Sequence, residues 1–209
     1  MISPGRLPAA GRGAAGIRRD TGTSLLETLA AAAAAVILAA VSVPAIGGQR
    51  GALQAAAAAR HVSALAHSAR AEALARGVHV ALVFQPMAQD FRFALFADGN
   101  YDGVRSADIT AGVDRQVSSW VRLGDQFSGA RFGIVAGATD PDSGTVLTGS
   151  PLKIGGSGVL SFGPAGGTTS GTLYVRGPGD EQFAIRLLGT TGRRRVLRYC
   201  AADRKWYPS

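Results

Sequence analysis

Three groups of residues in this chain have types and a spacing that could do chemistry. The first is a carboxylate, Glu27, at the mouth of a run without charged residues that extends to Arg50. The second is an oxygen-rich segment with Asp98, Asn100 and Asp102. The third is a cluster of arginines near the C-terminus, at Arg193, Arg194, Arg195 and Arg198. A carboxylate in apolar surroundings needs a partner, oxygens at alternate positions suit calcium, and clustered guanidinium groups bind phosphates.

The run that follows Glu27 is longer than the roughly 20 residues with which a helix crosses a bilayer. A glutamate that enters an apolar phase is expensive without a partner, so we treat Glu27 as functional. Residues 1–22 contain four arginines and one aspartate, and positive charge beside an apolar span stays cytoplasmic. We therefore expect a single span in the inner membrane, with the N-terminus in the cytoplasm and the C-terminal part in the periplasm.

A signal anchor or a secretory signal peptide would also have a basic start and an apolar run. Residues 43–45, Val-Pro-Ala, offer a weak cleavage site for signal peptidase. The apolar region of a signal peptide spans only about 7–15 residues, however, and Glu27 fits neither alternative.

The segment from Gly22 to Glu27 resembles the processing site of type IV pilins and type II secretion pseudopilins. That site reads Gly, usually Phe, then Thr or Ser, Leu, an aliphatic residue and Glu. The resemblance implies that a prepilin peptidase cuts between Gly22 and Thr23, which makes Glu27 the fifth mature residue. Pro44 falls where pilins carry a proline within the helix. Thr23 stands where the family has Phe, and this departure concerns methylation of the new N-terminus more than cleavage.

A second segment narrows the family. Residues 69–77 read Ala-Arg-Ala-Glu-Ala-Leu-Ala-Arg-Gly and resemble the Ala-Arg-Ser-Glu-Ala-Ile-x-x-Gly signature of the GspH/FimT pseudopilins. The chain is identified on this resemblance as a minor pseudopilin, a structural subunit of a type II secretion pseudopilus or a type IV pilus. The implied partners are other pseudopilins or minor pilins, prepilin peptidase and the inner membrane.

The elements that must position these groups follow from periodicity. Alanine is the best helix former, and apolar residues spaced by three and four give the second half of a long helix one apolar face. These residues are Ala58, Val62, Leu65, Ala69 and Ala73. We expect Pro44 and the nearby glycines to bend or locally melt this helix, and Gly77 to end it.

After Gly77 the period changes to the alternation of strands, and Gly, Pro, Asp and Asn punctuate the short runs, as in an antiparallel sheet or sandwich. We expect an α+β, pilin-like fold. It has a basic leader at 1–22, a transmembrane and amphipathic helix at 23–76, and a β-rich globular domain at 77–209. Residues 137–157 are rich in Gly, Ser, Thr and Asp, and we interpret them as a mobile loop.

The segment at 98–103 has the oxygens of the first half of a calcium loop, at Asp98, Asn100 and Asp102. Ile109 stands where the bidentate glutamate is needed, so a plain turn is favoured over a metal site. The histidines and the single cysteine, Cys200, lack ligand spacing, and no acid–base pair stands in a recognisable catalytic frame. We therefore expect neither an enzyme nor a cofactor. A membrane-anchored periplasmic enzyme is the third-ranked alternative.

The formal net charge is +8, and its densest part is the arginine cluster. Residues 192–195, Gly-Arg-Arg-Arg, fit the Gly-Arg-x-Arg motif of FimT-type members that bind DNA during natural transformation. By that resemblance Arg193 and Arg195 contact phosphates, and on a strand they project from one face while Arg194 projects from the other. The alternative is a solvated strand edge whose charge discourages aggregation. DNA binding is thus the alternative function.

Overall fold

The computed structural model describes residues 24–209, and for residues 39–48 it describes the backbone only. The expected leader, with Gly22 and Thr23 of the expected processing site, lies outside the described residues. Helix α1 spans Leu25–Arg76 and is continuous through Pro44, so the expected local melting is not observed. The helix ends at Gly77, which has a φ of 69° and donates its N–H to the carbonyl of Ala73.

Within the described residues, no helix is both long and apolar enough to cross a membrane. The expected fold class, in which the first half of the long helix spans a membrane, is wrong on this point. That expectation rested on the absence of charge after Glu27. Nine of the 22 residues between Glu27 and Arg50 are alanine, whereas Leu, Ile, Phe and Val are the residues that favour insertion.

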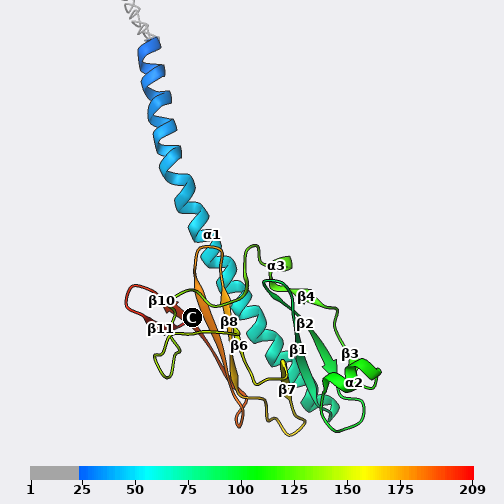
Figure 1. Ribbon diagram of the computed structural model, residues 1–209. Helices are drawn as coiled ribbons and strands as arrows, with labels where there is room; N and C mark the ends of the chain where they lie inside the picture. The colour runs from blue at the N-terminus through cyan, green and yellow to red at the C-terminus, as the bar shows by residue number, and fades with distance from the viewer. Residues whose placement is uncertain (1–23) are drawn as a thin grey trace, which may run out of the picture. The chain divides into compact units, whose positions relative to one another are not determined.

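The strands form two antiparallel sheets (Figure 1). The first has the order β3-β2-β1-β7, with β4 also paired to β2. Its strands are β1 (Val80–Pro86), β2 (Phe91–Ala97), β3 (Arg115–Gln116), β4 (Val121–Arg122) and β7 (Val159–Phe162). Two short helices, α2 (Ser106–Ala111) and α3 (Leu123–Gln126), lie in the connections between its strands and towards the second sheet.

The second sheet has the order β11-β10-β9-β8-β5, with β6 also paired to β8. Its strands are β5 (Arg131–Phe132), β6 (Leu152–Lys153), β8 (Gly171–Arg176), β9 (Gln182–Leu188), β10 (Arg193–Cys200) and β11 (Lys205–Pro208). The register places Arg195 opposite Arg186 and Arg198 opposite Tyr207, so β10 lies between β9 and β11.

The main core lies between the second half of α1 and both sheets. Among the residues of α1 whose side chains the structure describes, six of the nine that are buried are alanines, including Ala58 and Ala69 with no exposed surface. Small side chains let the helix backbone approach the sheets closely, and Phe132, Phe162 and Phe183 fill the space opposite. The apolar face expected at residues 58–73 is the buried face.

The chain divides into two compact units between Val43 and Pro44. The second half of α1 therefore belongs to the same compact unit as the strands. The physical reason is the alanine face, which is buried only because the sheets cover it.

Residues 137–157 are packed in part, in contrast to the mobile loop that we expected. Ala138 and Leu147 are buried with Tyr174 and Ala184. The segment also contains β6 and a bridge between Thr139 and Val146. A second difference is β11, which the sequence pattern did not predict.

Candidate functional site

The arginine cluster lies on β10, and the pleat separates its members onto two faces. Arg193 and Arg195 share a face with Leu197 and Tyr199, whereas Arg194 and Arg198 share the opposite face with Val196. Val196 packs against the core that contains α1, and Leu197 and Tyr199 pack in the smaller cluster around Tyr174. The four arginines are all exposed, so the cluster presents two cations on each side of the strand.

None of the four β10 arginines forms an ion pair with a carboxylate among residues 24–209. Arg194 instead has Nη1 2.9 Å from Nδ1 of His67 on α1. A guanidinium group can only donate, so His67 Nδ1 is the acceptor and the proton of the neutral imidazole is on Nε2. This hydrogen bond ties the strand to the helix and fixes where Arg194 points.

Arg186 lies directly opposite Arg195 on the neighbouring strand β9. Its Nη1 is 2.7 Å from Oδ1 of Asp142, and Nη2 donates to Oδ2, so the two groups form a bidentate ion pair. Such a pair neutralises the guanidinium charge locally. Arg186 is therefore next to the cluster in space without adding a free charge to it.

The aromatic residues beside the cluster take part in packing. Trp206 on β11 donates its Nε1–H to the carbonyl of Thr139 over 2.7 Å, and its ring lies 5.1 Å from that of Tyr199. Tyr207 is exposed and donates to the carboxylate of Asp203. Arg204 and Lys205 are exposed in and beside the β10–β11 turn. Among these rings, Tyr207 has the most exposed surface for a ligand to stack on.

Glu27 lies in the first turn of α1 and is exposed. Its backbone N–H is 3.3 Å from Oγ of Ser24, which is half of the Ser-x-x-Glu capping box. Sequence reasoning missed this local role, although the Ser-x-x-Glu spacing could have revealed it. A carboxylate in the first turn also interacts favourably with the helix dipole. Pro44 lies within α1, and its side chain is outside the described residues.

The segment at Asp98 forms a tight turn after β2. Asp98 Oδ1 accepts from the N–H groups of Asn100 and Tyr101, and Oδ2 accepts from Gly103. Burial raises the pKa of Asp98, but hydrogen bonds from three backbone N–H groups outweigh it and hold the pKa below its ordinary value. Both carboxylate oxygens are thus engaged by the backbone, as in an Asx turn. Asp102 forms an ion pair with Arg105, with Oδ2 2.8 Å from Nη1 of the arginine.

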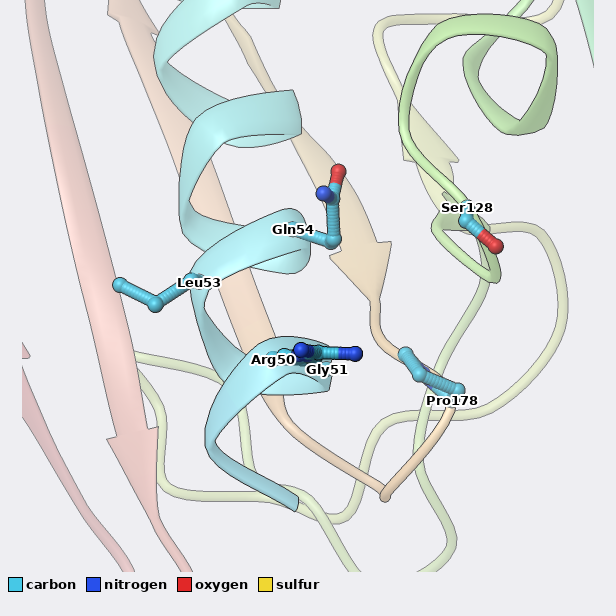
Figure 2. A pocket seen from close by; sticks show the side chains of 6 residues that line it. All are labelled: Arg50, Gly51, Leu53, Gln54, Ser128 and Pro178. Atoms are coloured by element: carbon cyan, nitrogen blue, oxygen red, sulfur yellow. The ribbon is translucent and has the colours of Figure 1, made fainter. Parts of the chain in front are cut away.

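A cavity of about 450 Å³ lies beside the second half of α1 (Figure 2). Its lining residues are Arg50, Gly51, Leu53, Gln54, Ser128 and Pro178. Figure 2 shows the Leu53 side chain pointing away from Pro178. A Cβ on Gly51 would lie 3.0 Å from Pro178 Cγ, so the glycine lets the turn approach the helix. The lining contains no acid–base pair, and within residues 24–209 no group of three His, Cys, Asp or Glu could hold a metal.

Comparison of the chain with protein-family models, with curated proteins and with solved structures gave no match. The candidate functional site is therefore defined by its own geometry. It comprises the four arginines of β10 with His67, next to the neutralised Arg186.

Proposed function

We propose that this chain is a minor pseudopilin, a structural subunit that assembles through α1 into a type II secretion pseudopilus or a type IV pilus. The observation that supports the proposal is the exposure of apolar side chains on the first part of the helix. Its large apolar residues are exposed. The exposed fraction of their surface is between 64% and 80% for Leu25, Leu26, Leu29, Val36 and Ile37. Glu27 is the single charge on this part of the helix. Such a surface needs a cover, and helices of neighbouring subunits supply one.

In this proposal the partners are prepilin peptidase, which removes the leader, and other pseudopilins or minor pilins, which cover the exposed side chains. The β-rich unit faces the periplasm. Processing is tested by co-expression with a prepilin peptidase and N-terminal sequencing. We expect a mature chain that begins at Thr23, and slower cleavage of Gly22→Ala because that enzyme class needs a small residue there. A chain that begins at Ile46 would point to ordinary signal peptidase and end the proposal.

Assembly is tested by two variants of Glu27 that separate its charge from its place in the capping box. Gln can occupy the last position of the box, whereas Ala cannot. If a neighbouring N-terminal amine neutralises the carboxylate, Glu27→Gln and Glu27→Ala both lose filament incorporation while the β-rich unit stays folded. Normal incorporation of Glu27→Gln with loss only for Glu27→Ala would assign the residue to helix capping. The readout is the amount of the chain in purified filaments and in crosslinks to other pilins.

DNA binding is the second candidate function. It is favoured by one observation, that the four exposed arginines of β10 have no carboxylate partner within residues 24–209. A patch that neutralises about three to five phosphates should show a slope of roughly −3 to −5 in log affinity against log salt, and micromolar or weaker affinity. The assay is a salt titration of the purified full-length chain on labelled duplex.

The matched variants for this assay remove two charges each. Arg193→Gln with Arg195→Gln should lower both the affinity and the slope, because these side chains share one face of β10. Arg115→Gln with Arg131→Gln removes the same charge from β3 and β5 and should change little. No binding at low salt, or an equal loss of affinity in the two double variants, would leave the structural role as the only candidate function.

A further inference from the structure

A second feature, which shares Arg193 and Arg194 with the arginine cluster, is a cavity between α1 and the β9–β10 turn. We name it the Arg70 cavity. Its volume is about 420 Å³, and it is lined by Ser63, Arg70, Thr191, Gly192, Arg193, Arg194, Val196 and Ser209. Three of these residues carry a guanidinium group, and none of the residues that line the cavity is Asp or Glu. Such an arrangement concentrates positive potential in a concave surface.

The side chain of Arg70 is held in a fixed position by two turns. Its Nε donates to the carbonyl of Gly166 over 3.0 Å. A Cβ on Gly166 would lie 3.2 Å from Nη2 of Arg70, and a Cβ on Gly192 would lie 2.5 Å from its Nε. Both glycines have positive φ values, 85° and 61°. The guanidinium group therefore occupies space that only glycine leaves open on both sides.

This fixation uses only one of the donor groups of Arg70. Nε is bonded to Gly166, and within residues 24–209 the Nη groups have no hydrogen-bonded protein acceptor. Arg194 is oriented in a similar way, through the hydrogen bond of its Nη1 to His67. Two guanidinium groups from different elements thus line the same cavity with their orientation already set, which lowers the entropic cost of binding an anion.

We propose that the Arg70 cavity binds a phosphate group, with Arg70 and Arg194 as its principal ligands and Arg193 at its edge. The planar fork of a guanidinium group matches the oxygens of phosphate in two-point hydrogen bonds. The inference goes beyond subunit assembly. It differs from the DNA candidate above in its use of Arg70 on α1, although the two share Arg193 and Arg194. The phosphate could belong to a nucleic acid backbone or be free.

The test uses the full-length chain and inorganic phosphate as the probe, measured by titration calorimetry against sodium chloride of equal ionic strength. We expect saturable binding to the wild type and about tenfold weaker binding to Arg70→Gln and to Arg194→Gln, because each loses charge-assisted hydrogen bonds. Arg131→Gln removes an equal charge from β5 and should bind as the wild type. Arg70→Lys should bind less well than the wild type, since it keeps the charge without the fork.

Arg194 is exposed, so Arg194→Gln tests the site even if Arg70→Gln fails to fold, which circular dichroism would reveal. Phosphate that binds no better than chloride, or binds Arg194→Gln as tightly as the wild type, would overturn the proposal. A labelled short single strand identifies the source of the phosphate. If phosphate displaces the labelled strand from the protein, the ligand of the cavity is a nucleic acid backbone. If phosphate binds without displacing the strand, the ligand is a free anion. DNA binding that depends on Arg193 and Arg195 but not on Arg70 or Arg194 would leave the DNA candidate standing and exclude a nucleic acid backbone as the source of the phosphate.

Discussion

Arg186 on β9 and Asp142 in the segment before β6 form a bidentate ion pair, with Nη1 of the arginine 2.7 Å from Oδ1 of the aspartate. The two residues are 44 positions apart in the sequence. Arg186 also lies opposite Arg195. One carboxylate from a distant segment therefore decides how many free cations this face of the sheet presents.

The first prediction concerns Asp142→Asn, which should release Arg186 to bind phosphates. If the DNA candidate is correct, the slope of log affinity against log salt should steepen by about 0.9, the value for one further phosphate contact. Stability should change little, since ion pairs with exposed partners contribute little. Asp125→Asn, which frees Arg122 on β4, is the control and should leave the slope unchanged. An unchanged slope for Asp142→Asn would mean that Arg186 lies outside the footprint.

The second prediction concerns the turn at Asp98, whose pKa is held low by backbone hydrogen bonds despite burial. Asp98→Asn should cost about 1 to 3 kcal/mol, because an amide cannot accept from Gly103 with its NH₂ group. A carboxylate whose pKa is lower in the folded state stabilises the fold at pH values above its unfolded pKa of about 3.9. This contribution to stability is lost as the pH falls through the folded pKa. In urea unfolding at pH 3 to 7, the free energy of unfolding should fall less at acid pH in the variant than in the wild type. Asp102→Asn is the exposed control.

The third prediction concerns His61, whose ring lies 5.3 Å from that of Phe127. Burial lowers the pKa of His61. The unfolded chain therefore takes up a proton near pH 6.5 that the folded chain resists, so stability falls as pH decreases from 6.5 towards the folded pKa. His61→Gln should flatten this part of the profile of unfolding free energy against pH. A profile that keeps its slope in His61→Gln would contradict the assignment to His61.

The fourth prediction concerns Trp206, which connects β11 to residues 138–147. Trp206→Phe removes the hydrogen bond to Thr139 and should destabilise the fold by about 1 to 3 kcal/mol. It should also speed amide exchange in that segment, measured by hydrogen exchange with mass spectrometry. Tyr207→Phe removes an exposed hydrogen bond to Asp203 and should have little effect. Equal exchange rates in both variants would show that β11 does not hold the segment.

The sequence by itself predicted features that depend on neighbours in the chain. The long helix, its alanine face and its end at Gly77 follow from helix propensity and periodicity, and α1 ends at Arg76. The turn at Asp98 follows from the side chains of that segment, and the two faces of β10 follow from the pleat. These features could be read because the interactions that form them span only a few residues. The inference of a membrane span also used local sequence, but absence of charge is a weaker criterion than strong apolarity.

Only the tertiary structure decided which arginines are free, paired or fixed. Arg194 contacts His67 across 127 positions of sequence, and Arg70 is held by Gly166 across 96. The strand β11 and the packing of residues 138–147 depend in the same way on Trp206 reaching Thr139. The sequence shows how many cations a segment contains. Their partners depend on long-range packing, which the local periodicity of the sequence does not predict. The physical reason is that a guanidinium group is neutralised or left available by whichever acceptor the fold places within about 3 Å of it.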